Sequence, residues 1–119
     1  MSRASDFFEW TPDLAEMARL AAAVGKLAEG EDDEGRLAIA WTLLNRLGRS
    51  RKRDGGPAGA DFADRDFLLA LAALCRAWAG AAPDPTRGAT HFHPHTELPR
   101  WARHKAPNAL IGGNLFYAP

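Results

Sequence analysis

Residues 30–48, GEDDEGRLAIAWTLLNRLG, carry the pattern that decides the fold of this chain. Acidic side chains open the stretch, where the positive end of a helix dipole favours them. Apolar side chains then recur three and four residues apart, which predicts a helix with one buried face. We expect Gly48 to end the helix, because glycine is common at that place. The buried stripe is expected to be Leu37, Trp41, Leu44 and Leu47, with Ala40 and Leu43 beside it.

A further helix is predicted on each side of this one. Thr11-Pro12-Asp13 combines a hydroxyl cap, a proline for the first helical position and an acid, so a helix is expected to begin there. A third helix is expected over about residues 64–78, closed by Gly80. Cys75 falls on its apolar stripe and is interpreted as a core residue rather than a nucleophile. The stripe of the first of these two helices is Leu14, Met17, Leu20, Val24 and Leu27, and that of the other is Phe67, Leu68, Leu71, Leu74, Cys75 and Trp78.

The C-terminal third has a different character. Pro94, Pro99 and Pro107 forbid a long helix in it. Residues 90–95 alternate weakly between apolar and polar, which predicts a short strand. Residues 110–117 surround a Gly-Gly-Asn turn and are expected to form two more short strands.

The length of 119 residues fits one domain over residues 1–119. Within it, residues 1–10 are interpreted as an N-terminal extension and residues 48–63 as a basic, glycine-rich loop. The predicted fold class is therefore mainly α (α+β), a compact helical domain with a short irregular or β C-terminal third.

Charge and composition exclude several classes of protein. Fifteen Lys plus Arg balance fifteen Asp plus Glu, which argues against a polycationic nucleic-acid binder. No apolar run approaches the roughly 20 residues that span a bilayer, so we expect no membrane partner. The single Cys75 excludes a disulfide framework within the chain and any multi-thiolate zinc site. Residues 1–10 lack the basic start and apolar stretch of a secretory signal, which predicts a protein made in the cytoplasm.

Two groups of side chains could carry chemistry. In an extended segment His91, His93 and His95 would share one face, either as zinc ligands or, as we prefer, bonded to a loop and lining a groove. The acidic run 29–34 could place a carboxyl group at a helix end, partly desolvated, as cleavage of a glycosidic bond requires. The alternative is a solvated helix junction. Trp101 stands in a polar stretch and could stack on a sugar ring.

Three blocks of the sequence resemble a known family. They are GEDDEGRLAIA with LNR, residues 30–40 and 44–46; DPTRGATHFH with PRWAR, residues 84–93 and 99–103; and IGGNLFY, residues 111–117. In this order they are similar to the motifs of the SleB-like cell-wall hydrolase family, which includes spore-cortex-lytic enzymes and phage and proteobacterial relatives. The resemblance implies a lysozyme-like domain that degrades peptidoglycan as a glycosidase of the lytic transglycosylase type. It implies no cofactor and no metal, and peptidoglycan glycan strands as the partner.

The resemblance also implies positions for the site residues. Asn45 and Arg46 would close the central helix beside the active cleft. His91, His93 and Trp101 would lie on the far wall of that cleft. The full set of substrate-binding residues that it implies is Asn45, Arg46, His91, His93, Trp101 and Tyr117.

The acid of the family is the first Glu of an E-A-x-G-E motif, and the ungapped match places residues 27–31, LAEGE, at this motif. Leu27 therefore stands at the acid position, and leucine cannot donate a proton. Glu31 matches the second Glu and is the first candidate for the catalytic carboxylate, with Glu29 as the second.

Two functions follow as hypotheses. The first is a peptidoglycan glycosidase, of phage or prophage type, that uses Glu31. The second, motivated by Leu27, is a catalytically impaired scaffold that binds glycan or serves as a structural virion or tail component. Under both, the protein is expected to act on the cell wall after release or as part of a phage-like particle.

Overall fold

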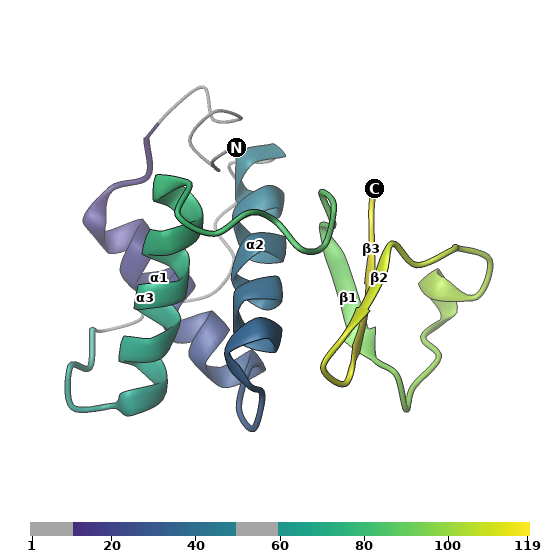
Figure 1. The fold of residues 1–119 in the computed structure, drawn as a ribbon, viewed down its shortest axis with the longest axis horizontal. Coiled ribbons are helices and arrows are strands. Elements are labelled where there is room, and N and C mark those ends of the chain that lie inside the picture. Colours follow the sequence, from purple (N-terminus) through teal and green to yellow (C-terminus); the bar gives the residue numbers. More distant parts are fainter. Residues whose placement is uncertain (1–10, 50–59) are drawn as a thin grey trace.

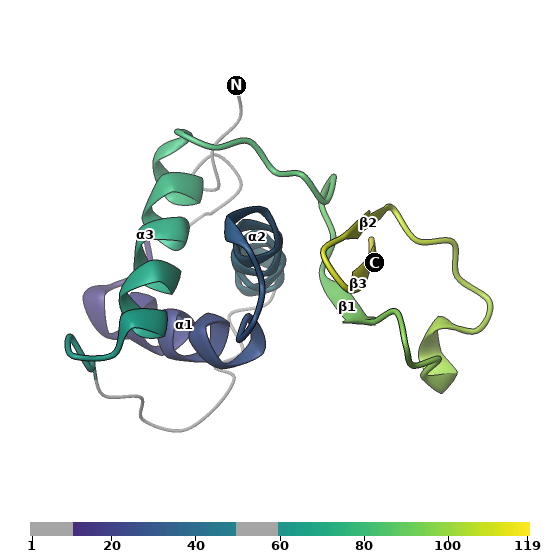
Figure 2. The same ribbon diagram turned by 60° about the horizontal axis from the view of Figure 1, so that its bottom comes forward.

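Helix α2, Asp33–Arg49, is the centre of the computed structural model, which describes residues 11–49 and 60–119 (Figure 1). Helices α1, Leu14–Leu27, and α3, Arg65–Ala79, lie on one side of α2, and a small sheet lies on the other (Figure 2). Helices α1 and α3 pack against each other and against α2, and α2 also contacts strands of the sheet. The predicted extension and most of the predicted basic loop lie outside the described residues.

The sheet contains three short antiparallel strands in the order β1-β3-β2. The hairpin between β2 and β3 turns at Gly112 and Gly113, and Gly112 has a φ of 59°, which glycine adopts without strain. The connection between β1 and β2 contains the 3-10 helix η2. The bounds are β1 His91–Pro94, η2 Arg100–Ala102, β2 Ala109–Ile111 and β3 Asn114–Tyr117. The predicted strands, and with them the mainly helical α+β fold class, are confirmed.

Helix α2 is buried on almost every side, not only along the predicted stripe. The reason is its position between α1 and α3 on one side and the sheet on the other. Trp41, fully buried, also donates its indole N–H to the carbonyl oxygen of Ala82 at 3.1 Å. No helix in the described ranges is long and apolar enough to cross a membrane. The buried residues of α2 are Gly35, Ala38, Ile39, Ala40, Trp41, Thr42, Leu43, Leu44 and Leu47.

Helix α1 begins two residues later than predicted, and the two ends of its predicted stripe are exposed, whereas Val24 of that stripe is buried. Asp13, not Thr11, is the N-cap, and it exchanges hydrogen bonds with Glu16 in a capping box. Leu14 and Leu27 are 83% and 50% exposed, which corrects the predicted leucine stripe. The cause is the close approach of α3, because a Cβ at Gly25 would stand 3.3 Å from the backbone of Asp66. This contact favours a face of small side chains, which includes Ala21, Val24 and Ala28.

Helix α3 confirms the predicted end at Gly80, whose φ is 77°. Its sequence offers two overlapping stripes, one through Leu74 and one through Cys75. The structure buries the first, so Leu68 is 42% exposed and Cys75 is exposed, and the prediction that both are core residues is wrong. The two positions are seven residues apart and therefore lie on the same flank of the helix. The buried stripe is Phe67, Ala70, Ala73, Leu74 and Ala77.

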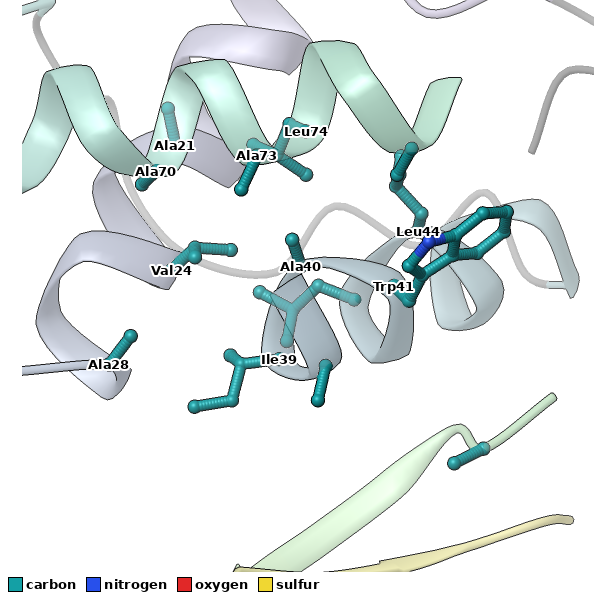
Figure 3. Close-up of a cluster of buried hydrophobic side chains, with 14 of the residues drawn as sticks. Ala21, Val24, Ala28, Ile39, Ala40, Trp41, Leu44, Ala70, Ala73 and Leu74 are labelled. Carbon is teal, nitrogen blue, oxygen red and sulfur yellow. The ribbon is translucent and has the colours of Figure 1, made fainter. Parts of the chain in front are cut away.

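One cluster of buried apolar side chains joins the helices to the sheet. Figure 3 shows Val24 from α1 and Leu74 from α3 directed toward Ala40 of α2. On the other side of α2, the cluster includes Ile111 and Phe116 from the sheet. The sheet is therefore held against α2 by the same core that holds the helices.

The two leucines of α3 provide a matched test of this packing. Leu74→Ala should lower the free energy of unfolding by about 2–5 kcal/mol, because it leaves a cavity at a fully buried site. Leu68→Ala, at the exposed site of the same helix, should lower it by less than about 1 kcal/mol. Urea denaturation followed by circular dichroism measures both values. Equal losses would contradict the observation that α3 buries Leu74 and exposes Leu68.

Candidate active site

The two candidate carboxylates, Glu29 and Glu31, lie in the short link between α1 and α2. Helix α1 stops at Leu27, and the chain turns through Gly30, which has a φ of 79°. The backbone N–H of Glu31 closes this turn by donating to the carbonyl oxygen of Ala28 at 2.9 Å. Glu29 is exposed, Leu27 is half-exposed, and Glu31 is partly buried. Of the two predicted carboxylates, only Glu31 is therefore turned toward the interior.

The carboxylate of Glu31 connects the helices to the sheet. Its Oε1 accepts a hydrogen bond of 2.9 Å from the side-chain amide of Asn114 in β3. Its Oε2 lies against two glycines, Gly35 of α2 and Gly112 of the hairpin turn. A Cβ at Gly35 would stand 2.6 Å from this oxygen, and a Cβ at Gly112 would also collide with it. The two glycines thus make the space that the carboxylate occupies.

His95 lies close to the same hairpin turn as Glu31. Its Nδ1 bonds the carbonyl oxygen of Gly113 at 2.9 Å, and its backbone N–H donates to the same oxygen. A Cβ at Gly113 would lie 3.6 Å from His95 Nδ1 and 4.0 Å from Glu31 Oε1. Sequence reasoning missed that Asn114 and His95 flank Glu31. The signal that could have indicated it is the Gly-Gly pair, since such positions often mark close approach of another group.

Asn45 and Arg46, predicted to bind substrate, bond the chain that leads into β1. Asn45 donates its side-chain amide to Asp84 Oδ2 and to the carbonyl oxygen of Ala89, each at 2.9 Å. Arg46 Nε donates to the carbonyl oxygen of Thr90 at 3.0 Å. These bonds give both residues a role in positioning β1 relative to α2.

The other predicted binding residues form an aromatic cluster, defined here as His91, His93, Trp101 and Tyr117. The ring centroid of Trp101 lies 5.6 Å from those of His91 and His93 and 5.1 Å from that of Tyr117. His93 and Tyr117 are buried, whereas Trp101 is 42% exposed. Part of the indole of Trp101 is therefore exposed, while three neighbouring rings contact it.

Hydrogen bonds fix the protonation of His93 within this cluster. Its Nδ1 lies 2.7 Å from the carbonyl oxygen of Pro94, which can only accept, so Nδ1 carries the proton. In the neutral imidazole, Nε2 then accepts from the hydroxyl of Tyr117 at 2.8 Å. Burial, and then the positive charges of Arg46 and Lys105, lower the pKa of His91 from its ordinary value.

The alternative of a zinc site on the three histidines is not supported. His91 Nδ1 bonds the hydroxyl of Thr90, and the ring of His95 is directed to the hairpin turn. Within residues 11–49 and 60–119 no group of three or more His, Cys, Asp and Glu side chains is arranged to hold a metal ion.

The predicted site residues are divided between the two faces of the sheet. Register pairs His91 with Tyr117 and Phe92 with Phe116, and paired residues share a face. Phe92 and Phe116 contact the core, so the aromatic cluster lies on the outer face. Asn114 is two residues from Phe116 and shares the inner face, where it bonds Glu31. The expectation of one cleft with Glu31 opposite the cluster therefore does not describe this arrangement.

Comparison with known proteins supports the fold. No protein-family model matches the chain, and no curated protein matches it either. Among solved structures, the catalytic domain of the Bacillus cereus SleB protein is similar, with a TM-score of 0.71 and 22% identity over 93% of this chain and 95% of that one. The catalytic domain of the germination-specific lytic transglycosylase SleB from Bacillus anthracis has a TM-score of 0.62 and 23% identity over 89% of this chain and 96% of that one. The chain thus has the fold of SleB catalytic domains, as the sequence motifs indicated.

The glycine-lined space around Glu31 can be tested by a double-mutant cycle. Gly35→Ala normally stabilises a helix, but here its methyl group would displace the carboxylate of Glu31, so we expect a loss of about 1 kcal/mol or more. The same change in a Glu31→Ala background should cost less, with a coupling energy of about 1 kcal/mol or more. Urea unfolding of the four proteins measures the coupling, and an identical effect of Gly35→Ala in both backgrounds would refute this contact.

Proposed function

We propose that this chain is a glycosidase that cleaves the glycan strands of peptidoglycan, with Glu31 as its catalytic carboxylate. The observation that carries the proposal is the placement of Glu31 at the junction of helices and sheet, where Asn114 orients one oxygen. The fold supports the substrate class, because one similar structure is that of a lytic transglycosylase. The carboxylate is partly buried, and a position partly removed from water is what a general acid for sugar cleavage needs.

One carboxyl group can serve both halves of such a reaction. Protonated Glu31 gives its proton to the glycosidic oxygen as the bond from that oxygen to the anomeric carbon breaks. The resulting carboxylate then takes a proton from the hydroxyl that attacks the anomeric carbon, whether that hydroxyl belongs to water or to the sugar itself. Asn114 would hold the carboxylate in one orientation through both steps.

Purified sacculi provide the test of this proposal. Wild-type protein should reduce their turbidity and release soluble sugar fragments that mass spectrometry detects. Glu31→Gln should slow release by about 10²–10⁴-fold, because it removes the acid but retains the shape of the side chain. Glu34→Gln, in the exposed first turn of α2, is the matched control and should act like the wild type. Equal rates for wild type and Glu31→Gln, or loss of activity in Glu29→Gln alone, would disprove the role of Glu31.

A second candidate function is glycan binding without cleavage. It is favoured by Leu27, which stands at the acid position of the motif and is 50% exposed at the end of α1. Such a protein would be a glycan-binding or structural component of a virion or tail. Under either function we propose that it reaches the cell wall after release from the cytoplasm or within a phage-like particle.

The reverse substitution distinguishes the two functions. If the scaffold only binds, wild-type protein should sediment with sacculi without releasing fragments. Leu27→Glu should then gain measurable release, because the substitution restores a carboxyl group at the acid position of the motif. Leu27→Gln, of the same shape and without the acid, is the control. Cleavage by the wild type would exclude this second function.

A further inference from the structure

The ring of His95 is held in one protonation pattern beside the hairpin turn that also borders Glu31. Its Nδ1 lies 2.9 Å from the carbonyl oxygen of Gly113, which can only accept, so Nδ1 carries the proton. In the neutral ring Nε2 is then an acceptor, and no residue within 11–49 and 60–119 bonds it. Because the side chain is exposed, His95 offers the solvent a lone pair rather than an N–H group.

One small space separates this ring from the carboxylate of Glu31. A Cβ built on Gly113 would lie 3.6 Å from His95 Nδ1, 3.9 Å from His95 Cε1 and 4.0 Å from Glu31 Oε1. These are ordinary van der Waals distances, and apart from the chain neighbours of Gly113 no other described atom lies nearer. A space of about methyl size is therefore bordered by both the imidazole and the carboxylate. The acceptor Nε2 is bonded directly to Cε1, one of the atoms at this border.

Both groups are attached to consecutive residues of the same hairpin. The backbone N–H of His95 donates to the carbonyl oxygen of Gly113 at 2.8 Å, in addition to the bond from its ring. The next residue, Asn114, donates its side-chain amide to Glu31 Oε1 at 2.9 Å. The hairpin thus fixes the imidazole and the carboxylate relative to each other, as two groups that act on one reacting centre require.

From this juxtaposition we propose that His95 is the base that activates water during cleavage by Glu31, so that this chain hydrolyses glycan strands rather than cyclising their ends. The role rests on the proposed function. As Glu31 gives its proton to the glycosidic oxygen, the oxygen of water bonds the anomeric carbon and a proton of this water passes to Nε2 of His95. The imidazolium then loses this proton to the solvent, and the carboxylate of Glu31 regains one from it. An acid and a base on separate residues, with room for water between them, are typical of hydrolysis by inverting glycosidases.

The ends of the released fragments reveal which hydroxyl attacks. Attack by water leaves a reducing end, whereas attack by a hydroxyl of the sugar itself leaves a cyclic end that is lighter by one water molecule. Mass spectrometry of fragments from purified sacculi distinguishes the two, and the wild type should release mainly reducing ends. His95→Ala should lower the ratio of reducing to cyclic ends by about 10²-fold, the contribution of one positioned base.

Three further measurements assign this effect to the ring of His95. Imidazole added to the His95→Ala protein should restore reducing ends, because the position is exposed. His104→Ala, at another exposed histidine, should keep the wild-type ratio. Gly113→Ala should lower the ratio, since its methyl group would fill the space between the two groups. The backbone of Gly113 lies outside the left-handed region and the methyl contacts are ordinary, so the midpoint of urea unfolding should not change.

Four outcomes would overturn the proposal. NMR of the imidazole nitrogens that finds the neutral ring of His95 protonated at Nε2 would remove the base. Only cyclic ends from the wild type, with loss of release in Glu31→Gln, would refute the role of His95 and support that of Glu31. An unchanged ratio in His95→Ala, with all fragments slowed together, would leave His95 a structural role alone. No release by the wild type would refute the proposed cleavage, and this role with it.

Discussion

The carboxylate of Asp84 holds the chain between the helices and the sheet, and the placement of the sheet depends on it. Oδ1 accepts from the backbone N–H and the hydroxyl of Thr86, at 2.8 and 2.6 Å. Oδ2 accepts from the backbone N–H of Gly88 at 3.0 Å and from the side chain of Asn45 at 2.9 Å. One side chain thus shapes the loop that enters β1 and attaches it to α2. These bonds account for Asp84, Thr86 and Gly88 of the block DPTRGATHFH and give Asp84 a structural role.

With the sheet attached to α2, the candidate site residues lie on two different faces of the sheet. The inner face of the sheet packs against α2, and Asn114 on this face donates a hydrogen bond to Glu31. Trp101 lies at the outer face and is partly exposed. A sheet of three short strands can serve two surfaces in this way because its alternate side chains point in opposite directions.

The sequence predicted the local features of the fold and missed those that depend on distant contacts. The strands, the end of α3 at Gly80 and the acidic start of α2 follow from turn residues, caps and periodicity, which act over a few positions. The choice between two overlapping stripes on α3 depends on which flank meets α1, so Cys75 was wrongly placed in the core.

For the candidate site too, the sequence indicated local features and missed contacts between distant residues. Glu31 followed from its place in a motif, but its partner Asn114 is 83 positions away, and no local rule pairs them. The face on which His93 lies depends on strand register, and a shift of one residue reverses it. Hence the sequence indicates Glu31 as a candidate, but neither its partner Asn114 nor the division of the candidates between two faces follows from local rules.

Gly25 determines how closely α1 and α3 approach, and therefore which part of the molecule can change shape. Without a side chain there, α1 meets the first turn of α3 backbone to backbone, and even one methyl group would press on Asp66. Two helices in such contact cannot slide past each other at this point without a steric collision, so we expect little relative motion between α1 and α3. We therefore expect conformational change mainly in the C-terminal part of the chain, where most side chains between residues 95 and 107 face the solvent.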